Sequence, residues 1–223
     1  DAKSRLRPAA LLGRALSQVG NGDIDKAKAD LLLLKSEATT NKYGAGWELK
    51  ADYTLATVLE EANRPEAKQA FDSLETFAKN YSSREDIDPA DRAYAAELSG
   101  LARLAKGRVL IRENRAPDAQ RSFAQILGDE KEVPAVRAAA LVGSGLALQA
   151  QNKLKEAQFA FAKVRVVYHA EAEPMAEATY QLGVVCEALG AAEPRGAALA
   201  QEYFKEVAQR YPASRFASKA QEK

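Results

Sequence analysis

Residues 157–164, which read AQFAFAKV, carry the pattern that decides the fold. Alanine is followed four residues later by a large apolar residue, Phe161, and three residues after that by Val164. Residues at these spacings lie on one face of an α-helix. The stretch therefore predicts an amphipathic helix that packs through one small and two large side chains.

The same pattern occurs in five places along the chain. Its copies are Ala27-Leu31-Leu34, Ala67-Phe71-Leu74, Ala119-Phe123-Ile126, Ala157-Phe161-Val164 and Ala200-Phe204-Val207. A glycine on the preceding helical stretch, Gly107 or Gly145, comes before two of the alanines. We expect this glycine to face the alanine and let the two backbones approach, while the large residue fills the seam with the next pair. Repetition of this kind is typical of helical repeat proteins.

Turn signals divide the chain into helix pairs. Asn63-Arg64, Asn114-Arg115 and Asn152-Lys153 each separate two apolar helical stretches, as tight helix–helix turns do. No stretch alternates apolar and polar residues as a strand would. We predict an all-α fold in a single domain over residues 1–223. The expected pairs are about five, at about 4–38, 46–80, 89–128, 134–168 and 174–211, with a short cap at 213–221.

Composition and charge exclude two classes of partner. The chain has 32 Lys+Arg against 31 Asp+Glu, and the basic residues form no run. A protein that binds nucleic acid usually has a basic stripe, because phosphate contacts supply most of the affinity. The longest weakly polar stretch, residues 138–150, is shorter than the roughly 20 residues that span a bilayer. We therefore expect no nucleic-acid partner and no transmembrane segment in this chain.

Residue types that perform chemistry are scarce. His169 is the one histidine and Cys186 the one cysteine, whereas a zinc site needs several such ligands. Gly143-Ser-Gly145 lies in a helical stretch with no preceding strand, so it does not predict a dinucleotide site. We expect no catalytic residue, no metal and no cofactor. Two of the 31 acidic residues could still form a catalytic carboxylate pair, so a helical-solenoid enzyme remains an alternative.

The spacing of the small residue, the alanine and the aromatic residue resembles that of the tetratricopeptide repeat. The last copy shows it best, in Tyr180-Gln-Leu-Gly183, Gly190, Ala200-x-x-x-Phe204 and the stretch 210–214, RYPAS. This copy resembles the variant found in bacterial envelope proteins, which include outer-membrane assembly lipoproteins and the periplasmic TolA-binding coordinator. The resemblance covers roughly residues 46–216, and every interval between copies exceeds the family's ~34 residues. A generic helical bundle and another type of helical solenoid remain alternatives.

The resemblance implies a right-handed superhelix whose first helices line a concave groove that binds a protein or peptide. With the small residue counted as the eighth of each repeat, the groove positions are Lys50, Tyr53, Thr57, Glu60, Leu101, Leu104, Arg108, Ile111, Ala139, Val142, Leu146, Gln149, Glu177, Tyr180, Val184 and Glu187. Tyrosine and arginine are common interface anchors. The predicted partner-binding residues are Tyr53, Arg108, Tyr180, Leu104, Gln149 and Glu187.

The sequence thus predicts a scaffold for protein–protein interaction and not an enzyme. The resemblance favours a bacterial envelope assembly, in the periplasm or envelope, over the cytoplasm. The chain begins with Asp1, so we expect that a leader was removed or that the chain was excised from a longer one. The alternative is a self-assembling structural module, a homo-oligomer of stacked repeats. Residues 213–223 discriminate, because a polar outer face there favours a finished monomer and an apolar one favours self-association.

Overall fold

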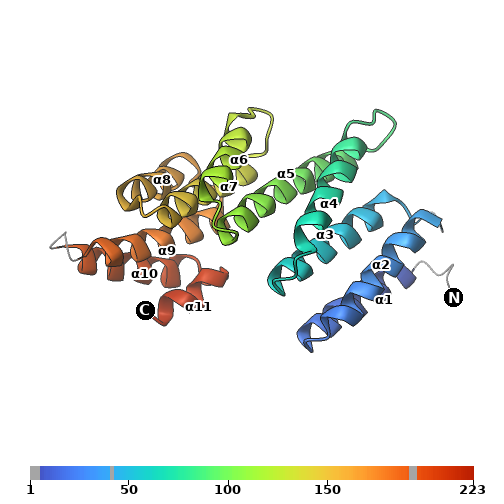
Figure 1. Cartoon of the computed structure of the whole chain (residues 1–223), viewed down its shortest axis with the longest axis horizontal. Helices are drawn as coiled ribbons and strands as arrows, with labels where there is room; N and C mark the ends of the chain where they lie inside the picture. Colours follow the sequence, from blue (N-terminus) through green and yellow to red (C-terminus); the bar gives the residue numbers. More distant parts are fainter. Residues whose placement is uncertain (1–5, 41–42, 191–194) are drawn as a thin grey trace. The chain divides into compact units, whose positions relative to one another are not determined.

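The computed structural model describes residues 6–40, 43–190 and 195–223. Every regular element in these ranges is an α-helix (Figure 1). The helices are α1 (Arg7–Gly20), α2 (Ile24–Thr40), α3 (Ala45–Glu61), α4 (Ala67–Ser82), α5 (Pro89–Arg112), α6 (Ala116–Gly128), α7 (Pro134–Ala150), α8 (Leu154–Val167), α9 (Ala172–Leu189), α10 (Gly196–Arg210) and α11 (Arg215–Gln221). The predicted all-α fold is confirmed, with five helix pairs and a short terminal helix. The expected start at residue 4 lies outside the described residues.

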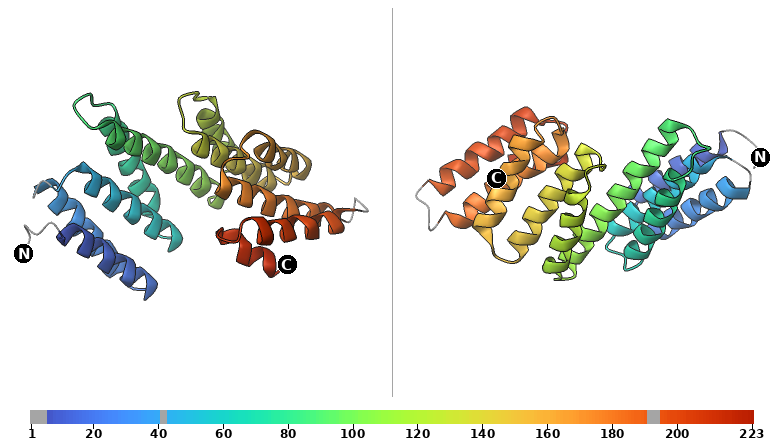
Figure 2. Two further views of the ribbon diagram at one scale, coloured as in Figure 1. Left: turned by 180° about the vertical axis from the view of Figure 1, so that it is seen from behind. Right: turned by 90° about the horizontal axis from the view of Figure 1, so that it is seen from above.

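The chain divides into two compact units, Asp1–Lys106 and Gly107–Lys223. Helix α5 belongs to the first unit up to Lys106 and to the second from Gly107 onward. Within each unit a helix packs against the next helix in the chain, and first helices of successive pairs also touch, as α1 does α3 and α7 does α9 (Figure 2). Packing mainly between successive helices and successive pairs is the arrangement of a helical repeat protein.

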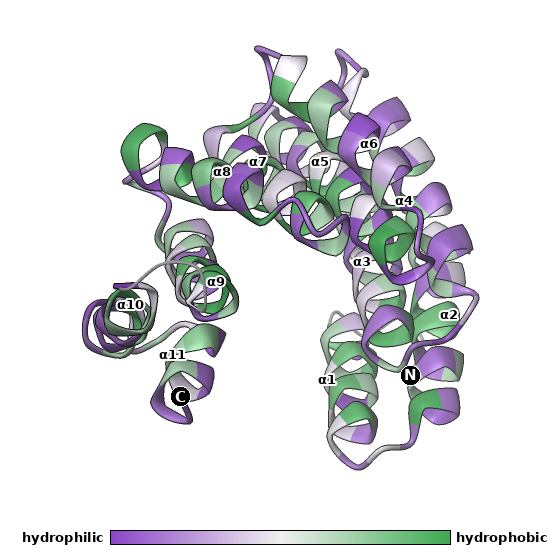
Figure 3. Ribbon diagram, turned by 60° about the vertical axis from the view of Figure 1, so that its left-hand side comes forward, coloured by the Kyte–Doolittle hydropathy of each residue, from purple (hydrophilic) through white to green (hydrophobic). Residues whose placement is uncertain are grey.

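The repeated large residue forms the seams. Phe71, Phe123, Phe161 and Phe204 are each at most 2% exposed, and they are the largest side chains of the buried core. Hydrophilic and hydrophobic colours alternate along the helices in Figure 3, as expected where one face of each helix is buried. The prediction that these positions fill the seams is therefore confirmed.

The glycines of the first helices lie against these phenylalanine rings. A Cβ added to Gly107 would lie 2.5 Å from Cε1 of Phe123, and one added to Gly145 would lie 2.4 Å from Cε1 of Phe161. Phe123 also meets Gly143 of the next pair, at 2.5 Å from the added Cβ. The expected partner of the glycine was the alanine of the second helix, and this was wrong: the ring is the nearest group. A glycine is needed because a methyl group would overlap the ring.

The predicted tight turns share one geometry. Asn63, Asn114 and Asn152 have φ of 52°, 59° and 60°, in the left-handed region that asparagine tolerates better than most residues. At the third of these turns Asn152 N–H donates to the carbonyl of Gln149, and Lys153 N–H donates to that of Leu148, both at 2.9 Å. These two bonds cap the end of a helix with a Schellman motif. The turn reverses the chain in three residues, 151–153, so the second helix packs on the first.

Candidate functional site

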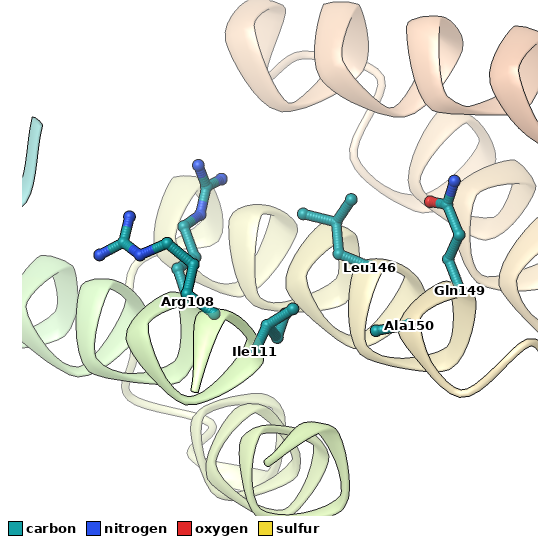
Figure 4. A pocket seen from close by; sticks show the side chains of 6 residues that line it. Arg108, Ile111, Leu146, Gln149 and Ala150 are labelled. Carbon is teal, nitrogen blue, oxygen red and sulfur yellow. The ribbon is translucent and has the colours of Figure 1, made fainter. Parts of the chain in front are cut away.

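An open hollow of about 410 Å³ lies between α5 and α7 in the second unit, and we call it the α5–α7 hollow (Figure 4). The residues that line it are Arg108, Ile111, Arg112, Leu146, Gln149 and Ala150. On each helix two lining residues follow the first by three and four positions, which places each set on one face of its helix. Both helices are the first helices of their pairs.

Apolar side chains form one part of this hollow. Ile111 and Leu146 are half-buried and extend from α5 and α7, as the close-up shows, with Ala150 one turn beyond Leu146. A small apolar patch bordered by polar groups is the usual composition of a binding site. The size of the hollow suits one or two side chains of a ligand.

Arg108 stands at the edge of the hollow and is held by an ion pair. Its Nη2 donates to Oε2 of Glu177 on α9, at 2.7 Å. The Glu177 side chain is only 7% exposed, and the Arg215 guanidinium on α11 lies 3.8 Å from the same oxygen. A buried carboxylate that loses its partner is strongly destabilising. Arg108 therefore has a structural role at this position, whatever it contacts in a ligand.

Gln149 brings a hydrogen-bond acceptor into the hollow. Its Oε1 is buried and has no hydrogen-bond partner among the described residues. Leaving such a group unsatisfied costs about 1–3 kcal/mol, so native proteins rarely keep one without a reason. In Figure 4 the Gln149 side chain rises beside the hollow, on the same side as Leu146. A ligand N–H or O–H would satisfy this oxygen once the Gln149 side chain turns toward the hollow.

The six predicted partner-binding residues do not form one cluster. Arg108 and Gln149 meet at the α5–α7 hollow. Tyr180 is half-buried on α9, with its ring 5.5 Å from that of Phe204 and 5.6 Å from that of Phe216. Glu187, further along the same helix, accepts from Nζ of Lys223 at 2.7 Å.

The other two predicted residues lie in the first unit. Tyr53 on α3 is half-buried and packs against the core of that unit. Leu104 on α5 is 5% exposed and belongs to the buried core. That any of the six residues binds a partner stays a prediction.

Counting repeat positions missed two residues of the hollow. Arg112 and Ala150 each come one residue after the last predicted groove position of their helix, Ile111 and Gln149. Each is also four residues beyond another lining residue, Arg108 or Leu146. An i, i+4 extension of the predicted groove positions would have found both.

The residues considered for chemistry lie apart from this hollow. Cys186 on α9 is 2% exposed, accepts a hydrogen bond from Nε2 of Gln158 at 3.6 Å, and its pKa is raised by burial. His169 is exposed just after α8. Across the described ranges, no group of three or more His, Cys, Asp and Glu residues could hold a metal ion. No helix in those ranges is long and apolar enough to cross a membrane.

Comparisons with known proteins add little to this picture. No protein-family model matches the sequence, and no curated protein matches it. One solved structure, a tetratricopeptide repeat protein from Parabacteroides merdae, aligns with 90% of this chain and 92% of its own, at 15% identity and a TM-score of 0.28.

Proposed function

We propose that this chain is a scaffold, similar to tetratricopeptide repeat proteins, that binds a segment of a partner protein on its first helices at the α5–α7 hollow. The observation that carries this proposal is the convergence of two first helices on one open apolar hollow with a buried acceptor, Gln149 Oε1, left unpaired. The repeated seams provide a rigid support for such a surface, and rigid support lowers the entropic cost of binding.

The lining residues suggest how a ligand would sit. An apolar side chain fits against Ile111 and Leu146, and a backbone or side-chain N–H reaches Gln149 Oε1. Arg112 adds positive charge at one edge. Few anchors of this kind suffice for modest affinity, because most binding energy at an interface comes from a few residues.

We infer a place in a bacterial envelope assembly from the last repeat alone. Residues 180–214 resemble the repeat of envelope proteins, and this supports a periplasmic or envelope location over the cytoplasm. Immunogold labelling of the native protein in its own cell tests the location. Label confined to the cytoplasm would remove this part of the proposal and leave the binding site unaffected.

One observation disfavours the alternative of a self-assembling module. Helix α11 buries Phe216, Ala217 and Ala220, and its outward residues are polar. They are Arg215, Ser218, Lys219 and Gln221. End-to-end stacking through this helix would bury charged and polar groups, which costs free energy unless they are paired.

The test uses peptides selected on the protein from a random displayed library. The variant Gln149→Leu removes the acceptor, and Ala150→Trp fills the hollow; Gln125→Leu and Ala124→Trp make the same changes at exposed positions of α6. We expect the first two to weaken the selected peptides by about tenfold, and the controls to bind as wild type. Equal binding by all four variants would refute the site.

The stability of Gln149→Leu separates binding from folding. Because the amide oxygen has no partner, replacing Gln149 with leucine should leave the melting temperature unchanged or raise it. Loss of binding together with undiminished stability is the signature of a binding residue. Arg108→Ala is a poor test, because it also breaks the ion pair with buried Glu177.

A further inference from the structure

Helix α8 exposes a row of apolar side chains on a second-helix surface. Phe159 is 74% exposed and Val166 78% exposed, with exposed Ala162 between them. The spacing i, i+3, i+7 aligns the three on one face, and we call them the α8 stripe. A phenylalanine or valine this exposed contributes little to packing the chain, and grouped exposed apolar residues mark interaction sites.

The α8 stripe continues into a second hollow, of about 540 Å³, which we call the α8–α10 hollow. Its lining residues are Ala162, Arg165, Val166, His169, Met175, Leu182, Tyr203, Arg210 and Tyr211. Two residues of the stripe, Ala162 and Val166, thus belong to its wall. The stripe and hollow together form one surface along α8, separate from the α5–α7 hollow in all of its lining residues.

The charges around this surface are mainly positive. Arg165 and Arg210 both donate to Glu206, at 2.8 and 2.9 Å, so one carboxylate is shared by two guanidinium groups. None of the described residues that line the hollow is acidic. On the helical wheel Lys163 flanks the α8 stripe on one side and Arg165 on the other. The surface therefore combines an apolar row with basic flanks.

We propose that this surface docks an amphipathic helix of a partner protein whose apolar row is flanked by acidic side chains. The apolar row of such a helix would cover Phe159 and Val166, and its carboxylates would face Lys163 and the shared arginines. Charge complementarity selects this occupant over a second copy of the chain, because two copies would bring like charges together. The proposal is independent of the α5–α7 hollow.

The experiment uses a fluorescein-labelled helical peptide of about 15 residues, with leucines at i, i+3 and i+7 and glutamates beside them. A second peptide replaces every glutamate by lysine. The double variant Phe159→Ser/Val166→Ser removes the stripe, and Leu32→Ser/Leu33→Ser removes two partly exposed leucines from α2 as the matched control. Fluorescence anisotropy gives the affinities and thermal melts check folding.

We expect the acidic peptide to bind wild type and the α2 control alike, and the α8 double variant about tenfold more weakly. Added salt should weaken binding, and the basic peptide should bind poorly.

Absence of binding, equal binding of both peptides, or unchanged binding by the α8 variant would each overturn the proposal. Weaker binding to Gln149→Leu would instead assign the peptide to the α5–α7 hollow. Self-association of wild type that the α8 variant abolishes, measured by sedimentation equilibrium, would make a second copy the occupant.

Discussion

The two units join their helices by different means. In the first unit, charged pairs connect successive helices: Arg14 of α1 donates to Asp30 of α2 at 2.5 Å, and Lys35 of α2 donates to Asp52 of α3 at 2.7 Å. In the second unit every seam phenylalanine lies against a glycine, as Phe204 does against Gly183. The second unit also contains charged pairs between helices, such as Arg108 with Glu177, but it adds the close packing of phenylalanine rings on glycines.

This difference has a physical consequence. A buried carboxylate is stable as an ion only while its cationic partner is present, because alone it is poorly solvated. The packing of a ring on a glycine does not depend on any charged group, but it tolerates no added side-chain volume. The two units should therefore respond to different perturbations, and each contains a natural probe. Trp47, the one tryptophan, lies on α3 in the first unit, and Cys186, the one cysteine, is buried in the second.

Gly145→Ala should have the largest effect. Three ring atoms of Phe161 lie 2.4 to 2.8 Å from the position of the new methyl group, so the ring or the helix must move. We expect a loss of about 3 kcal/mol in the free energy of unfolding, at the upper end of the range for overpacking. Urea unfolding followed by the reactivity of Cys186 measures it.

The same substitution on α1 is the matched control. Nothing lies within 4 Å of a Cβ added to Gly13, which is inside an exposed part of that helix. Gly13→Ala should therefore stabilise the protein, by about 0.5–1 kcal/mol, because alanine loses less backbone entropy in a helix. If both glycine substitutions shift unfolding in the same direction, the close contact with the ring does not govern the seam.

Lys35→Met should cost the first unit about 2 kcal/mol. It leaves the Asp52 carboxylate, 4% exposed, without its ammonium partner. Trp47 fluorescence during urea unfolding measures the loss. Adding Asp52→Asn should recover part of it, since the neutral amide is cheaper to bury. A double variant no more stable than Lys35→Met would show that the unpaired Asp52 carboxylate is not what costs the stability.

Asn152→Ala should cost about 1 kcal/mol, because alanine is strained at a φ of 60°. Asn152→Gly should stay within about 0.5 kcal/mol of wild type, since glycine adopts this conformation freely. Thermal melts of the two variants give the comparison. Equal losses would mean that the asparagine side chain, and not the backbone conformation, stabilises the turn between α7 and α8.

Acid should give the smallest effect, and the first unit should show it. The bond from Arg14 lowers the pKa of Asp30, and that from Arg7 lowers the pKa of Glu37. A carboxyl with a lowered folded-state pKa contributes stability above its unfolded pKa of about 4, and this is lost as the pH falls through the folded value. Burial raises the pKa of Asp52, which works in the opposite direction and reduces the net change.

The measurement is the urea midpoint reported by Trp47 between pH 7 and pH 3. We expect the urea midpoint to decrease once the pH drops below about 4. The decrease should be smaller in Arg14→Met, whose Asp30 has lost the group that lowers its pKa. A variant that follows the wild-type curve would show that this ion pair does not carry the acid sensitivity.

The fold was predictable because its signals are local. Helix periodicity, the repeated alanine and phenylalanine and the asparagine turns all act within one helix pair, so the sequence alone places them. The partner of Gly145 was not predictable in the same way. Which side chain fills the space beside a glycine depends on how deeply two helices interlock, and neither spacing nor composition reports that depth.

The candidate site was predictable in part for a similar reason. Repeat counting nominated Arg108, Ile111, Leu146 and Gln149 separately, and the structure places these four around one hollow. The pairing of Arg108 with Glu177 joins α5 to α9, which opens the second helix pair further along the chain, and no local pattern indicates it. The exposure of the α8 stripe was missed because Phe159 fits a buried pattern as well as an exposed one.

Helix α5 is shared by the two units, and this has a mechanical meaning. A chain pulled from both ends transmits its load through the hydrogen bonds of one helix instead of through a slack linker. When one unit unfolds under force, the part of α5 that belongs to it loses its packing partners. The remaining turns of α5 are still packed in the other unit. Extension should therefore pause with part of α5 still helical, and not at a loop.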